Sequence, residues 1–151
     1  GWMAREIKSI ANCNNVLGID GSKSMIDNAK NIDPDGEYIT GNINEWVPEN
    51  KFNLVMSMEV FYYLEKPREL ISKIYSQFLH SPGMLVIGID HYKENIPSLT
   101  WPGDLNLELR TYSEKHWKDM LIDSGFKKVN SKTTPSNGDW NGTLILTGVK
   151  G

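Results

Sequence analysis

The sequence predicts an α/β fold built on a doubly wound, mostly parallel sheet. Three short apolar runs, 16–19, 52–58 and 84–89, have the length of buried strands, and each ends next to an acidic residue. Most of these runs are followed by a segment whose apolar residues recur at helical spacing, which predicts a helix after each. Because ligands of such sheets bind outside the carboxyl ends of the strands, the acidic tips are where we expect a ligand site.

Size and composition indicate a single globular domain over residues 1–151, with 39% apolar and 23% charged residues. The net charge of -3 is spread over the chain, which offers no basic track for nucleic acid. No apolar run approaches the ~20 residues that a membrane span needs. The single Cys13 cannot form an internal disulfide, which suits the reducing cytoplasm, and the three histidines lack metal-ligand spacing, so we expect no metal site.

The chain begins with a helix, because Met3, Ile7 and Ile10 fall on one helical face. A parallel partner for the strand 16–19 requires a crossover helix, so we expect a strand upstream of Gly1 and a chain truncated at its N-terminus. Gly1 is then the last residue of a glycine-rich strand-to-helix turn.

The stretch 16–30 combines a strand, an acidic tip and a helix. Asp20 ends the strand, and Ser22 and Ser24 are both plausible N-caps of the helix that follows. A carboxylate at this place can accept hydrogen bonds from both hydroxyls of a ribose, which predicts a nucleoside site. The alternative is a surface turn with a solvated aspartate.

The rest of the chain continues the alternation of strands and helices. The connection 91–110 is long and irregular, which is typical of a lid or a binding loop. In chain order we expect a short strand at 38–40, a polar loop at 41–44, a central buried strand at 52–58, a loop or short helix at 59–64 and an amphipathic helix at 66–80 ended by Ser81-Pro82-Gly83. A strand at 84–89, a helix that begins after Ser113, a strand at 126–134, a turn at Asn137-Gly138 and a strand at 143–149 follow. Ser113 is a good N-cap for that helix, and Thr111 with Glu114 offers an alternative capping box.

These motifs together resemble the class I S-adenosylmethionine-dependent methyltransferases of the small-molecule type. VLGIDGSKSMIDNAK resembles the motif whose acid binds the ribose, GNIN the loop that reads adenine, and FNLVMSMEVFYYL the fourth-strand motif. The resemblance covers nearly the whole chain. It implies a Rossmann-like fold with a C-terminal antiparallel strand and with the family's first strand between 16–19 and 52–58. It also implies S-adenosylmethionine as cofactor, bound by Gly1, Asp20, Gly21, Met25, Asn42, Ile43, Ser57 and Met58.

Two positions depart from that family's pattern. Asn42 and Asn53 stand where the family most often has aspartate. An amide keeps hydrogen bonding but removes the charge, and it is a poorer acceptor for the exocyclic amine of adenine.

Methyl transfer from a sulfonium is an in-line displacement, which needs orientation, exclusion of water and, for some acceptors, a base. Side chains just after the strand ends are the candidates. The alternative for His91 is a partly exposed loop histidine, and for Trp101 a loop anchor; Glu59 is either a pocket acid or a solvated one. The candidates are His91 and Tyr62 for catalysis and Tyr63, Tyr92 and Trp101 for the substrate.

The sequence therefore predicts methyl transfer from S-adenosylmethionine to a small-molecule acceptor. Two alternatives stay open: a methyltransferase-like binding module without activity, and a nicotinamide-dependent dehydrogenase, whose fold also has an acid at the tip of its second strand. The GNIN loop and the terminal antiparallel strand disfavour the dehydrogenase. The acceptor, its N, O or C atom and the oligomeric state stay open.

Overall fold

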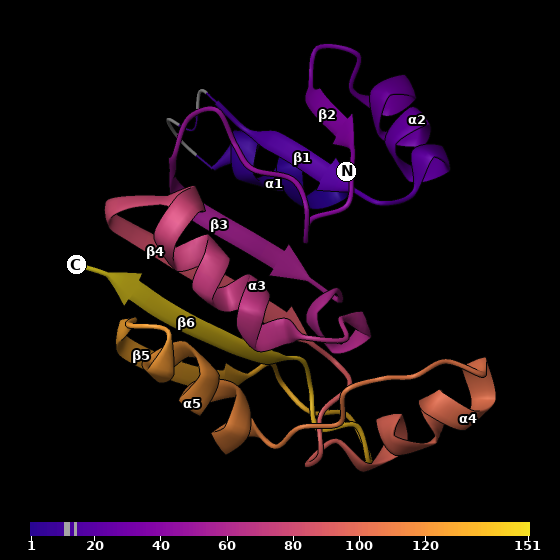
Figure 1. Cartoon of the computed structure of the whole chain (residues 1–151). Helices are drawn as coiled ribbons and strands as arrows, with labels where there is room; N and C mark the ends of the chain where they lie inside the picture. The colour runs from indigo at the N-terminus through magenta and orange to yellow at the C-terminus, as the bar shows by residue number, and fades with distance from the viewer. Residues whose placement is uncertain (11–12, 14) are drawn as a thin grey trace. The chain divides into compact units, whose positions relative to one another are not determined.

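The computed structural model describes residues 1–10, 13 and 15–151 and divides into two compact units, 1–47 and 48–151 (Figure 1). The single domain predicted over 1–151 stays a prediction. Within the described residues, every helix is too short or too polar to span a lipid bilayer.

Unit 1 is a parallel strand pair with two helices. Its strands pair in register from Leu17 opposite Glu37 to Asp20 opposite Thr40. A small core of Ile26, Ala29 and Tyr38 fills the space between helix and strands, because these side chains recur on one face of each element. The elements are α1 (Trp2–Ser9), β1 (Leu17–Asp20), α2 (Lys23–Ile32) and β2 (Glu37–Thr40).

Unit 2 is built on one sheet with the strand order β3-β4-β6-β5. β3 and β4 are parallel, whereas β6 runs antiparallel to both β4 and β5, as predicted for the C-terminal strands. The elements are β3 (Phe52–Met58), η1 (Phe61–Tyr63), α3 (Pro67–Lys73), η2 (Ile74–Phe78), β4 (Leu79–Ile89), η3 (Ile96–Thr100), α4 (Trp101–Leu105), α5 (Glu114–Asp123), β5 (Lys127–Thr133) and β6 (Leu144–Lys150).

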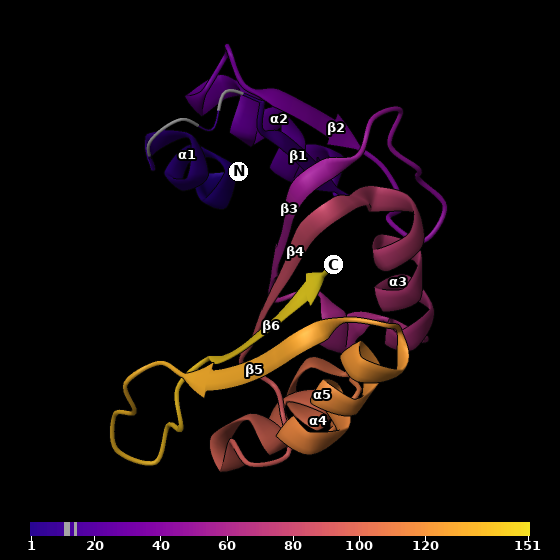
Figure 2. The same cartoon turned by 90° about the vertical axis from the view of Figure 1, so that its left-hand side faces the viewer.

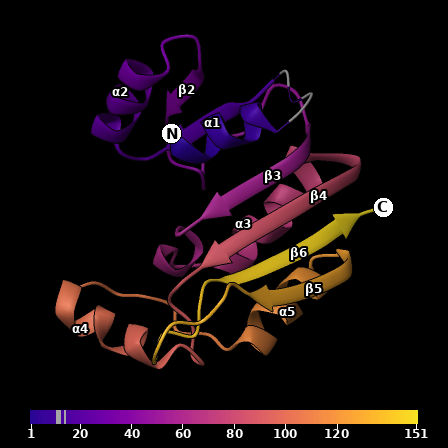
Figure 3. The same ribbon diagram turned by 180° about the vertical axis from the view of Figure 1, so that it is seen from behind.

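The core of unit 2 lies between the sheet and the helices α3 and α5, which cover one face (Figure 2). Ile71 of α3 and Trp117 and Leu121 of α5 are fully buried there, as are the sheet residues Leu85 and Leu146. Seen from behind, the four strands lie in front of α3 and α5 (Figure 3). The helix capped by Ser113 begins as predicted, since the Ser113 hydroxyl accepts a hydrogen bond from the His116 amide.

The helix predicted over 66–80 is wrong at its C-terminal end. Helix α3 ends at Lys73, a π-helical turn follows as η2, and β4 already begins at Leu79, ahead of the tripeptide expected to end the helix. Leu79 is fully buried and lies opposite Phe52 in the parallel register. Strand pairing thus replaces the last helical turn.

The central position predicted for the strand 52–58 is also wrong for the sheet of unit 2. β3 lies at the edge of that sheet with β4 as its neighbour. Leu54 and Met56, on one face of β3, are 37% and 36% exposed. An unbroken apolar run indicates a strand, but it does not say on how many sides the strand is paired.

Gly142 precedes β6 in a conformation that suits only glycine. Its φ is +83°, and a Cβ there would clash with the Thr134 carbonyl oxygen. We expect Gly142→Ala to lower the free energy of unfolding by about 1–3 kcal/mol, measured by urea denaturation. Gly103→Ala is the control, because nothing lies within 4 Å of its Cβ. Equal losses for the two variants would contradict the strain at Gly142.

Candidate functional site

The parallel pairing in unit 1 brings two predicted site residues to one sheet edge. Asp20 ends β1, and Asn42 lies two residues beyond the end of β2. The Gly41 amide donates to the Asp20 carbonyl oxygen at 3.0 Å, which joins the ends of the two strands. A carboxylate and an amide therefore share this edge.

The two carboxylate oxygens of Asp20 lie in different environments. The side chain is exposed, and its Oδ1 accepts a hydrogen bond from the Ser22 amide at 2.8 Å. Its Oδ2 makes no hydrogen bond within the part of the chain that the structure describes. One oxygen is thus anchored at the start of α2 and the other can accept a hydroxyl, so Asp20 fits a nucleoside ligand.

The other predicted cofactor residues of unit 1 lie in its helix α2, at the start of α1 and in the loops. Asn42 shapes its loop, because its Oδ1 accepts from the Asn44 amide at 3.1 Å and its Nδ2 donates to Glu45 at 3.0 Å. Gly1 is the N-cap of α1, and a Cβ there would lie 2.6 Å from the Ala29 Cβ. Gly21 has open space around it, Met25 is half-exposed and Ile43 is partly buried. Their contacts with a cofactor stay predictions.

Unit 2 has an edge of the same kind, formed by the parallel pair β3 and β4. Glu59 follows β3 and Asp90 follows β4, and the Glu59 amide donates to the Gly88 carbonyl oxygen at 2.9 Å. Glu59 has a φ of +58°, a left-handed conformation that is rare for a residue with a side chain. Ser57 and Met58, the predicted cofactor residues that end β3, are partly buried beside this edge, where their role stays a prediction.

The two carboxylates of this edge are only partly satisfied. The Tyr62 hydroxyl donates to Glu59 Oε2 at 2.7 Å. Glu59 Oε1 and Asp90 Oδ1 are buried and have no hydrogen-bond partner among the described residues. An unsatisfied buried acceptor costs ~1–3 kcal/mol, so two such oxygens side by side on one edge are unusual in a purely structural setting.

Burial has the largest effect on the electrostatics of this pair, and it raises the pKa of Glu59 to about 7. The Tyr62 hydrogen bond and the backbone amide of Asp90 favour the charged form, whereas the Asp90 carboxylate opposes it. Burial also raises the pKa of Tyr62 well above its usual range. Tyr62 is therefore a hydrogen-bond donor that orients Glu59, and its predicted catalytic role stays a prediction.

Aromatic side chains gather around Tyr62. Its ring centroid lies 4.5 Å from that of Tyr63, 5.6 Å from that of His91 and 6.4 Å from that of Trp101. Trp101 in turn stacks on Trp140 at 6.1 Å. We call these five side chains the aromatic cluster. The structure thus brings together four of the five candidates for catalysis and substrate binding.

His91 is held by hydrogen bonds at both ring nitrogens. Nδ1 donates to the Ser98 carbonyl oxygen at 2.9 Å, so Nε2 is the acceptor for the Thr111 hydroxyl at 2.7 Å. The side chain is buried, which lowers the pKa of His91 and favours the neutral ring. To act as a base, His91 would have to give up the bond to Thr111. The loop histidine considered as the alternative is thus a buried one, and the catalytic role stays a prediction.

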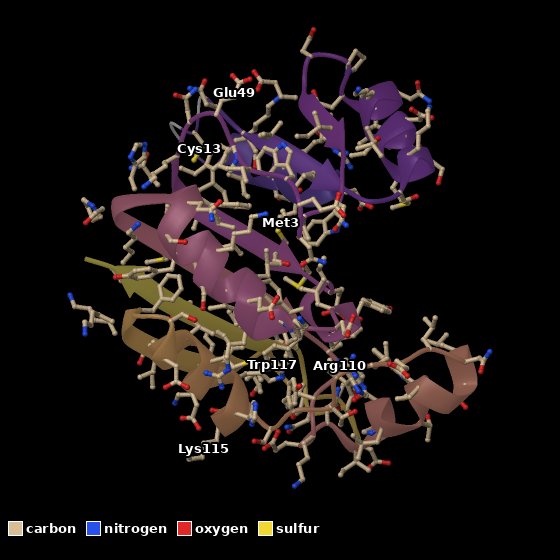
Figure 4. All side chains as sticks on the ribbon, in the orientation of Figure 1. Met3, Cys13, Glu49, Arg110, Lys115 and Trp117 are labelled. Carbon is tan, nitrogen blue, oxygen red and sulfur yellow. The ribbon has the colours of Figure 1, made fainter. Side chains whose placement is uncertain are left out.

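Tyr92 points to another part of unit 2. Its hydroxyl donates to the Gly142 carbonyl oxygen at 2.9 Å, and the side chain is buried. This contact ties the end of β4 to the segment before β6, and a substrate contact for Tyr92 stays a prediction. Arg110, labelled in Figure 4, lies in the segment before α5. Its Nε donates a hydrogen bond to the backbone carbonyl oxygen of Glu65.

Sequence reasoning left Glu59 undecided and missed Asp90 and Trp140 as site residues. The signal for the two acids was present, because each directly follows an apolar strand, as Asp20 does. Trp140 carried no such signal. It lies in the loop 134–143, and only the folded chain shows that its ring stacks on Trp101.

Residues 1–96 match the profile of a protein family described as a methyltransferase domain. The chain belongs to this family. S-adenosylmethionine is its cofactor, and the chain is an S-adenosylmethionine-dependent methyltransferase. When bound, this cofactor supplies a methyl group on a sulfonium sulfur. A search of the curated proteins finds no match.

Solved structures share the fold of this methyltransferase. A methyltransferase from Haloferax volcanii, in complex with the Trm112 activator, is 22% identical with a TM-score of 0.84, covering 99% of this chain and 77% of that one. A Mesorhizobium loti S-adenosylmethionine-dependent methyltransferase is 19% identical with a TM-score of 0.82, covering 99% and 86%. The N-methyltransferase NodS of Bradyrhizobium japonicum, with S-adenosylhomocysteine, is 17% identical with a TM-score of 0.75, covering 97% and 72%. The predicted α/β, Rossmann-like fold class is confirmed.

Glu59 should make the stability of the methyltransferase depend on pH. Because the pKa of Glu59 is raised from 4.5 to about 7, the folded state holds an extra proton in this window, and stability falls as the pH rises through it. The shift corresponds to about 3 kcal/mol at most, and solvent screening reduces the expected loss to about 1–2 kcal/mol.

Glu59→Gln should remove this loss and keep an acceptor for Tyr62. We expect the variant to be about 1–2 kcal/mol more stable than the wild type near pH 8 and to differ little near pH 4, measured by urea denaturation. The control is Glu65→Gln, at an exposed position. If Glu59→Gln and Glu65→Gln show the same pH dependence as the wild type, Glu59 is not the group responsible.

Proposed function

We propose that this methyltransferase transfers the methyl group of S-adenosylmethionine to a small-molecule acceptor bound at the sheet edge of unit 2. The observation that carries the proposal is the aromatic cluster beside Glu59 and Asp90, with Tyr62 and His91 buried and Trp101 and Trp140 partly buried. Aromatic side chains with a few polar groups beside them are typical of sites for small ligands. Tyr63 and Trp101 are the proposed substrate contacts.

In this proposal the residues of unit 1 bind the nucleoside part of the cofactor. Asp20 accepts the ribose hydroxyls with its Oδ2, and the loop of Asn42 and Ile43 binds the adenine. We also propose that both units act as one methyltransferase domain, which is supported by a family match over 1–96 that crosses the boundary at residue 47. The exposed thiol of Cys13 suits the cytoplasm.

The experiment that tests the acceptor uses methyl-labelled S-adenosylmethionine and a cell extract divided by ultrafiltration into small molecules and macromolecules. We expect enzyme-dependent label in the small-molecule fraction only. Label on protein or nucleic acid would contradict the small-molecule acceptor. The absence of transfer to either fraction, despite normal binding of S-adenosylhomocysteine, would support the alternative of a binding module.

The test of the cofactor role of Asp20 is a calorimetric titration with S-adenosylhomocysteine. Loss of the charged hydrogen bonds in Asp20→Ala should weaken binding by about 1.5–3 kcal/mol, which is about ten- to a hundredfold. Asp35→Ala, in an exposed turn of the same unit, is the control. A loss below about threefold would remove Asp20 from the site, and preferential binding of NAD would favour the dehydrogenase.

A further inference from the structure

The two carboxyl groups at the sheet edge of unit 2 have no basic partner within the described part of the chain. No lysine, arginine or histidine among the described residues forms an ion pair with Glu59 or Asp90. Arg110, in the segment before α5, has other partners. Its Nη2 lies 3.7 Å from the Glu108 carboxylate, and its Nε donates to the Glu65 carbonyl oxygen. His91 is buried, which lowers the pKa of its ring and favours the neutral form.

The unsatisfied atoms of this edge are acceptors. Glu59 Oε1 and Asp90 Oδ1 are both buried and have no partner in the part of the chain that the structure describes, while the Tyr62 hydroxyl donates to Glu59 Oε2. A ligand that completes the edge must therefore donate hydrogen bonds, and it gains most if it carries positive charge. An alcohol has one donor, whereas a primary ammonium group has three.

The aromatic cluster beside the carboxylates favours the same kind of ligand. Tyr62, which holds Glu59, lies 6.4 Å from Trp101 between ring centroids, and Trp101 stacks on Trp140. Faces of tyrosine and tryptophan attract cations, by ~0.5–2 kcal/mol depending on solvent exposure. They also pack against the carbon skeleton of a ligand.

We infer that the methyl acceptor is a primary or secondary amine, bound as its ammonium ion by Glu59 and Asp90 with its carbon skeleton on Tyr63 and Trp101, whose side chains are not fully buried. This inference rests on the proposed function. Glu59 takes one proton from the ammonium nitrogen, which regains its lone pair. That lone pair forms the N–C bond to the methyl group, the C–S bond breaks, and its electron pair stays on sulfur. Glu59 then releases its proton to water.

The test compares amines with alcohols of the same carbon skeleton. The full chain, with S-adenosylhomocysteine present, is titrated with butylamine, phenylethylamine and putrescine and with the matching alcohols, followed by calorimetry and tryptophan fluorescence. We expect at least one amine to bind about tenfold more tightly than its alcohol. Glu59→Gln and Asp90→Asn should each lower this preference by about tenfold, and the exposed Glu65→Gln should keep it.

Two results would overturn the inference: equal affinities of amines and alcohols for the folded wild-type chain, or an amine preference that survives both substitutions. Binding of S-adenosylhomocysteine, read in the same titrations, separates the two proposals. If it binds and amines show no preference, the amine inference alone fails; if it does not bind, the proposed function fails. An acceptor from the extract that carries the methyl group on oxygen would also overturn the inference.

Discussion

The parallel pairing of strands is the constraint on which the sheet edge of each unit depends. A parallel ladder puts the carboxyl ends of its two strands at one edge, so residues far apart in the chain meet there. In unit 2 this ladder continues to the bond from the Glu59 amide to the Gly88 carbonyl oxygen, which sets the two carboxylates on one edge. In unit 1 the ladder of β1 and β2 places Asp20 and Asn42 in the same way.

This arrangement opposes stability. Among the described residues, two partly buried carboxylates lack partners for one oxygen each. Glu59 also has a backbone conformation that costs ~1–3 kcal/mol. The core under α3 and α5 must offset these terms, and its fully buried Trp117 and Leu121 show where that stabilisation lies. Unfavourable groups of this kind gather at functional sites, where a ligand supplies the missing interactions.

Features that depend on neighbours in sequence were predictable. The strand 52–58 has the predicted bounds, and the caps Ser22 and Ser113 both accept the expected backbone amide, because these signals act within a few residues. Features that depend on distant pairing were not. The end of α3 follows from the pairing of β3 with β4, which begins already at Leu79, and no local pattern encodes that pairing.

The difference between local signals and long-range contacts also decides which site residues could be predicted. Strand tips are local features, so Asp20, Glu59 and Asp90 could be located in the sequence, but only the folded chain shows that two of their oxygens are buried without partners. His91 shows the opposite case. Its ordinary pKa makes it the natural candidate for a base, yet burial and two hydrogen bonds favour the neutral, fully engaged ring. Burial thus acts in opposite directions on the two groups. It lowers the pKa of His91 and raises the pKa of Glu59 to about 7, so that Glu59 is the group that binds a proton near neutral pH.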